Sequence, residues 1–88
     1  MLTPEALAHL IMGDGTNDHG HGVVLCTDSY TLSDIIRLMN VLIIRYRLEC
    51  TLRAHGSYYR IYIRSRSIPL LRSIVTPYIH SSMLYKLR

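Results

Sequence analysis

Ten lysine and arginine residues against six carboxylates give this 88-residue chain a formal charge of +4 with neutral histidines. The length fits one domain over residues 1–88, and a lone monomer of this size is only marginally stable. A hydrophobic content of 49% excludes a disordered tail. No segment approaches the roughly 20 apolar residues of a membrane span, so we expect no membrane partner.

The charges are distributed unevenly along the chain. Residues 1–36 contain five carboxylates and no lysine or arginine, whereas residues 37–88 contain nine arginines, one lysine and one carboxylate. Arginine suits bidentate recognition of phosphates and bases. The basic part of the chain therefore favours nucleic acid as the partner over an ordinary solvated surface.

The first half of the chain predicts two helices with strands between them. Thr3 as N-cap and Pro4 at the first helical position begin a helix that ends near Gly13 and Gly15. Residues 15–22 indicate a loop or an irregular strand, and residues 22–28 a strand. Thr31 then begins a second helix through a capping box.

The second half predicts a hairpin followed by helical segments. Residues 48–54 and 58–64 alternate apolar and polar side chains around a turn at 55–57. A third helix is expected over about 67–76, stopped by Pro77, and a short helical segment closes the chain. Antiparallel strands interleaved with helices indicate an α+β fold.

One face of this hairpin is apolar and belongs on a core, and the other is basic and aromatic. A two-stranded ribbon of this kind fits the major groove of duplex DNA. The alternative is a solvated strand face whose charges prevent edge pairing. The polar face holds Thr51, Arg53, His55, Arg60, Tyr62 and Arg64.

The remaining candidates are a carboxylate, two histidines and two cysteines. Asp14 stands where the first helix ends, and a carboxylate beside free helix carbonyls suits magnesium; alternatively it is a simple acidic residue in a turn. His19 and His21 are expected to contact solvent or nucleic acid rather than form a dedicated metal site. Cys26 and Cys50 form no disulfide framework and are expected to be reduced thiols.

Four segments carry a resemblance to a known family. Residues 7–15, LAHLIMGDG, resemble the signature of the LAGLIDADG homing endonucleases, although His9 replaces the motif's glycine. LCTDSYTL at 25–32, RIYIRS at 60–65 and PYIHSSMLYKL at 77–87 are similar to the C-terminal half of the two-motif organellar enzymes. The resemblance covers essentially the whole chain.

The resemblance implies an αββαββα half-domain whose four-stranded antiparallel sheet, with helices on one face, saddles the major groove of double-stranded DNA. It also implies that the signature helices of two halves pack together, so the chain acts as a homodimer or with a partner half. The expected nucleic-acid contacts are Arg53, His55, Arg60, Tyr62 and Arg64, with His21 and Asn17 as additions. The expected interface residues are Ala6, Ala8, Met12 and Gly13.

The resemblance assigns three catalytic residues. Asp14 corresponds to the acidic residue that holds a divalent metal, here Mg²⁺, at the scissile phosphates. Lys86 corresponds to a lysine that assists the active site, and Asp28 to a position near the catalytic waters. The implied activity is metal-dependent double-strand cleavage in a mitochondrion or chloroplast, by an organelle-encoded protein. The alternative is a non-catalytic module for structured RNA, in an intron maturase or a ribonucleoprotein such as the ribosome.

Overall fold

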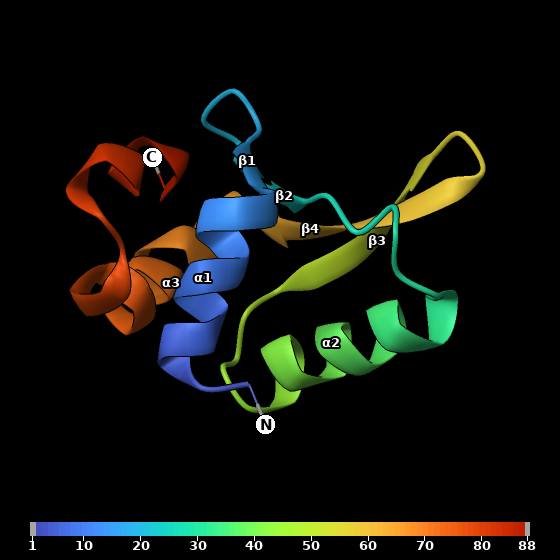
Figure 1. Cartoon of the computed structure of the whole chain (residues 1–88), viewed down its shortest axis with the longest axis horizontal. Helices are drawn as coiled ribbons and strands as arrows, with labels where there is room; N and C mark the ends of the chain where they lie inside the picture. The colour runs from blue at the N-terminus through green and yellow to red at the C-terminus, as the bar shows by residue number, and fades with distance from the viewer. Residues whose placement is uncertain (1, 88) are drawn as a thin grey trace.

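The computed structural model describes residues 2–87 and has a four-stranded antiparallel sheet with its helices on one side (Figure 1). The strands follow the order β1-β2-β4-β3 across the sheet. The predicted αββαββα order is confirmed. In chain order the elements are α1 (Pro4–Asp14), β1 (Gly15–Asn17), β2 (Gly22–Leu25), α2 (Leu32–Ile44), β3 (Cys50–His55), β4 (Tyr58–Arg64), η1 (Ser65–Ser67), α3 (Ile68–Val75), η2 (Thr76–Tyr78) and η3 (Ser81–Leu87), the η segments being 3₁₀ helices.

Both predicted helix starts are confirmed by side-chain caps. The Thr3 hydroxyl accepts a hydrogen bond from the Ala6 N–H at 3.1 Å, and Thr31 accepts one from Asp34 at 3.1 Å. Each cap satisfies one of the N–H groups that a helix leaves without a partner in its first turn. The caps fix where α1 and α2 begin, and the buried side chains Leu7, Ile11, Ile35 and Leu42 mark the faces that pack on the core.

The strand register confirms the two faces of the hairpin. Across β3 and β4, Cys50 lies opposite Ile63 and Leu52 opposite Ile61 on the inner face, which the helices cover. On the outer face Arg53 lies opposite Arg60. Strand β2 extends the inner face with two fully buried side chains. The buried inner-face residues of β2 and β4 are Val23, Leu25, Ile61 and Ile63.

Two boundaries differ from the sequence prediction, and the predicted closing helical segment is of the 3₁₀ type. Strand β2 ends at Leu25 instead of residue 28, because the chain turns away and the buried Thr27 hydroxyl donates to the Tyr59 carbonyl at 2.9 Å. Pro77 lies inside η2 rather than ending the helical segment, since an early helical position needs no N–H donor. The closing segment is a 3₁₀ helix, η3.

No helix within residues 2–87 is both long and apolar enough to span a membrane. The two cysteines of this part of the chain are free thiols, as predicted. Both are half-buried, Cys50 at the start of β3 and Cys26 just after β2.

A cross-strand pair tests the position of the core. Ile61 is fully buried and its partner Leu52, on the edge strand, is 38% exposed. We expect Ile61→Ala to lower the free energy of unfolding by about 2–5 kcal/mol through lost burial and a cavity. The matched Leu52→Ala should cost about half as much or less. Chemical denaturation measures both, and equal losses would contradict this placement of the core.

The two thiols should differ in reactivity. Burial raises the pKa of the Cys50 thiol to about 12, so almost none of it is the reactive thiolate at about pH 8. Cys26 should therefore react with iodoacetamide at least about tenfold faster than Cys50 in the folded protein, as read by peptide mass spectrometry. In denaturant the two rates should converge. Equal rates in the folded state would show that Cys50 is not shielded.

Candidate nucleic-acid interface and metal site

The first candidate site is the C-terminal end of α1. Asp14 is the last residue of this helix and β1 follows without a connecting residue. The Asp14 carbonyl accepts the Cys26 N–H at 2.9 Å, which ties the helix end to the chain leaving β2. A hollow of about 280 Å³ lies beside this helix end. Its lining residues are Gly13, Gly15, Thr16, Asn17, Tyr85 and Lys86.

Lys86 reaches the same helix end from η3, although 74 residues separate it from Met12. Its Nζ donates to the Met12 carbonyl at 2.6 Å and lies 3.5 Å from the Ile11 carbonyl. An ammonium group here meets the partial negative charge of the helix terminus. The structure therefore places Lys86 at the helix end that Asp14 terminates, and the resemblance assigns a catalytic role to each of these residues.

Asn17 has a different position from the predicted one. Its register partner is the buried Val23, so it belongs to the inner side of the sheet rather than the outer face. Its Nδ2 donates to the carbonyls of Tyr85 at 3.2 Å and Lys86 at 3.4 Å, and its Oδ1 accepts the Gly20 N–H at 2.7 Å. Asn17 thus anchors the segment that carries Lys86.

The donor set at this helix end fits part of a magnesium site. A carboxylate and helix-terminal carbonyl oxygens are the hard ligands that Mg²⁺ takes, usually with several waters. Within residues 2–87, however, no group of three histidine, cysteine, aspartate or glutamate side chains is placed to hold a metal ion. Among these side chains, Asp14 is the one carboxylate at the end of α1 that could bind such an ion.

The second candidate site is the outer face of the sheet, where two arginines lie opposite each other. Arg53 and Arg60 are a cross-strand pair, and like charges in this position repel. Each of the two arginines instead pairs with a different carboxylate. Arg53 Nη1 lies 3.0 Å from Asp18 Oδ2, and Arg60 donates to both oxygens of Asp28 at 2.9 and 2.8 Å.

Tyr62 connects this face to the β1–β2 turn. Its hydroxyl donates to the His21 carbonyl, and the Arg53 guanidinium lies 4.1 Å from the centre of its ring. The contact with His21 is to the main chain, so the exposed His21 side chain remains outside it. The turn and the outer face enclose a hollow of about 250 Å³. Its lining includes Thr16, Asp18, His19, Cys26, Arg53, His55 and Arg60.

The structure gives Asp28 a partner that the sequence did not indicate. Both of its carboxylate oxygens accept hydrogen bonds from Arg60. These hydrogen bonds are the main cause that lowers the pKa of Asp28 below its ordinary value; desolvation opposes them, and the charges of Arg60 and His55 add to the lowering. The sequence also did not indicate a partner for Asp18. Its partner, Arg53, is 35 residues away, and no local pattern marks the pair.

The predicted interface on α1 needs a correction. Ala8 is fully buried within the chain and Met12 packs against the core, so the inward face of the helix holds them. The outward face holds Ala6, His9 and Gly13 at helical spacing, and the His9 side chain is 68% exposed. Small residues suit close helix packing on either side, which is why the sequence could not assign Ala8 to one face.

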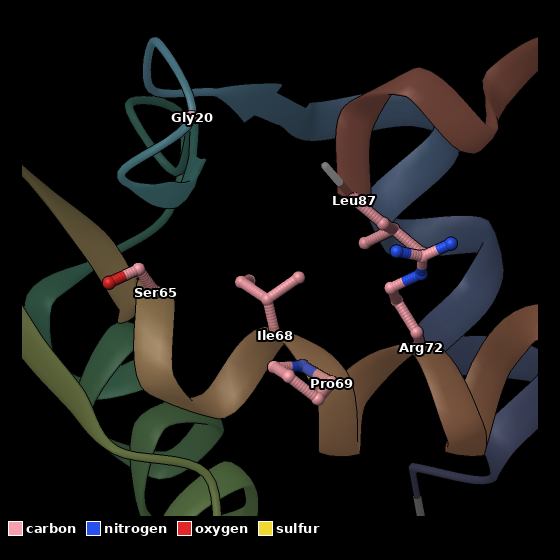
Figure 2. Close-up of a pocket in the computed structure, with 6 residues that line it drawn as sticks. All are labelled: Gly20, Ser65, Ile68, Pro69, Arg72 and Leu87. Carbon is pink, nitrogen blue, oxygen red and sulfur yellow. The ribbon is translucent and has the colours of Figure 1, made fainter.

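Another hollow, of about 440 Å³, has a separate lining from those of the two candidate sites (Figure 2). Ser65 borders one side of it, and Arg72 lies next to Leu87 on the other (Figure 2). Gly20, Ile68 and Pro69 complete the lining. None of the residues predicted to bind metal or nucleic acid lines this hollow.

Three comparisons with known proteins agree with this geometry. The model of the LAGLIDADG DNA endonuclease family matches residues 1–71. The chain is 40% identical over 88 residues to the cytochrome b mRNA maturase bI2 of Debaryomyces hansenii, and 39% identical to the intron-encoded endonuclease ai4 of Dictyostelium discoideum. Each alignment covers 98% of this chain, but only 33% and 55% of the respective relative.

A solved structure has the same fold. The homing endonuclease I-WcaI, bound to its DNA recognition sequence, superposes with a TM-score of 0.89 at 30% identity. The match covers 98% of this chain and 41% of that one. This chain therefore corresponds to about one half of the solved protein. From the match over most of its length, the chain belongs to the LAGLIDADG DNA endonuclease family.

Proposed function

We propose that this chain is one half of a metal-dependent endonuclease that binds duplex DNA on the outer face of its sheet and cuts it near α1. The observation that carries the proposal is that Lys86 is held at the same end of α1 that Asp14 terminates. Lys86 Nζ is held 2.6 Å from the Met12 carbonyl, two residues before Asp14. The DNA-bound relative supports duplex DNA as the substrate.

In this proposal Asp14 holds Mg²⁺ together with ligands from the DNA and from a second half. A bound Mg²⁺ would supply Lewis acidity toward the scissile phosphate. Lys86 places a fixed positive charge where negative charge develops in the transition state. Asn17 positions Lys86 by holding the η3 backbone, and Gly13 leaves open space beside the helix end.

Assembly follows from the incomplete ligand set. One chain contributes one Asp14, and cleavage of both strands needs a second one. The outward face of α1 is open at Gly13, since a Cβ added there would meet no atom within 4 Å. We propose that two chains pack along this face, either as a homodimer or with a partner half. The intron-encoded and cytochrome b relatives favour an organelle, a mitochondrion or a chloroplast, as the location.

A second function is favoured by one specific observation, the 40% identity to a protein named as an mRNA maturase. The same arginines on the outer face would then bind structured RNA without cleavage. Asp14 distinguishes the two functions, because cleavage needs the charge of its carboxylate and RNA binding does not.

Replacing Asp14 separates these functions. Asp14→Asn keeps the side-chain shape but removes the charge that a hard cation needs, so cleavage of a randomised duplex library in magnesium should be lost. Duplex affinity measured in calcium should stay near that of the native chain. Glu5→Gln, at the opposite end of α1, is the matched control and should cleave normally. Cleavage by Asp14→Asn would contradict the proposed metal site, whereas a native chain that prefers RNA and never cleaves would favour the maturase function.

Gly13→Gln tests the assembly. The added side chain has room in the single chain but would fill the space that a second helix needs. Since glycine inside a helix costs roughly 0.5–1 kcal/mol relative to alanine, the variant monomer should unfold at no lower temperature than the native monomer. Sedimentation velocity should show association of the native chain and a monomeric variant. A native chain that stays monomeric both free and on DNA would contradict self-association.

A further inference from the structure

The Asp28–Arg60 pair has a geometry that differs from the other ion pairs on the outer face. Arg60 donates through Nε to Asp28 Oδ1 at 2.9 Å and through Nη2 to Oδ2 at 2.8 Å. Both side chains are partly buried, with 24% of Arg60 and 37% of Asp28 exposed. Two parallel hydrogen bonds fix the plane of the guanidinium as well as its position. Arg53 has only a single contact with Asp18.

This contact leaves one edge of the Arg60 guanidinium available. A guanidinium carries five N–H donors in a rigid plane, and Asp28 engages the edge formed by Nε and Nη2. Nη1 and the second N–H of Nη2 form the opposite, terminal edge. In the major groove, O6 and N7 of guanine accept a bidentate pair of N–H donors in this arrangement.

Arg64 provides the contrast on the same strand. It lies on the same outer face, since residues 60, 62 and 64 alternate with the buried Ile61 and Ile63. Arg64 is exposed, and within residues 2–87 no carboxylate forms an ion pair with it. A long side chain without such a partner can follow a phosphate but loses more rotamer freedom when it reads a base.

We infer that Asp28 is a positioning residue that fixes Arg60 to read a guanine in the major groove, whereas Arg64 supplies affinity through the phosphate backbone. This inference rests on the proposed binding of duplex DNA. The resemblance implied a position for Asp28 near the catalytic waters. The inference instead gives Asp28 a role in DNA recognition, because both of its carboxylate oxygens accept hydrogen bonds from Arg60. The lowered pKa of Asp28 keeps the carboxylate ionised under ordinary binding conditions.

Binding selection from a randomised duplex library, in calcium so that no cleavage occurs, tests the inference. Arg60→Ala first identifies the base pair that Arg60 reads, as the position where a guanine preference disappears. Asp28→Asn should weaken the preference at that same position by roughly tenfold or more, and Asp28→Glu should retain part of it. Arg64→Ala is the matched control. It should weaken binding to all sequences and lower the salt dependence by about one unit, without changing the preference.

A second measurement changes the DNA instead of the protein. Replacing the identified guanine by 7-deazaguanine removes the N7 acceptor, so the native chain should bind that duplex roughly tenfold more weakly. For Asp28→Asn the same replacement should have little effect, because Arg60 is no longer fixed toward N7.

Two results would overturn the inference while leaving the proposed function intact. The first is an Asp28→Asn variant that binds all sequences more weakly with an unchanged preference, which would indicate a merely structural role. The second is a native chain that binds duplex DNA but is insensitive to 7-deazaguanine at the Arg60 position. A native chain that binds no duplex DNA would overturn both the inference and the proposed function.

Discussion

The step from α1 directly into β1 determines the position of the candidate site at the end of α1. The helix ends at Asp14 and the strand begins at Gly15, whose N–H returns to the Ile11 carbonyl. A Cβ at Gly15 would lie 2.6 Å from that carbonyl oxygen, so only glycine fits without a shift of the backbone. This tight junction sets Asp14 at the rim of the sheet and leaves helix carbonyls within reach of Lys86.

Charged side chains have a different role at each of the two candidate sites, the end of α1 and the outer face of the sheet. At the helix end, the Lys86 ammonium offsets the partial charge of the α1 terminus and remains within reach of a phosphate. On the outer face, Asp18 and Asp28 each pair with one of two arginines in register, and the two carboxylates offset the repulsion between Arg53 and Arg60. The acidic N-terminal part of the chain thus orders the basic C-terminal part, a relation that the uneven charge distribution along the sequence had left open.

Much of this could be predicted from local sequence signals. The caps at Thr3 and Thr31, the alternation in the hairpin and the acidic end of the first helix all depend on neighbours within a few residues, and the structure has them. The pairing of Asp28 with Arg60 and the anchoring of Lys86 by Asn17 span 32 and 69 residues and leave no periodic trace. Ala8 was placed wrongly for a different reason, since a small side chain fits both a core and an interface.

The position of the metal ion is the most direct test of the proposed endonuclease. With Mn²⁺ in place of Mg²⁺ and the chain bound to duplex DNA, paramagnetic broadening of backbone amide signals locates the ion. We expect the signals of Gly15 and Thr16, beside Asp14, to broaden most, and this broadening to disappear in Asp14→Asn. Broadening centred on His19 and His21, unchanged by Asp14→Asn, would place the ion in the β1–β2 turn and contradict a metal site at the end of α1.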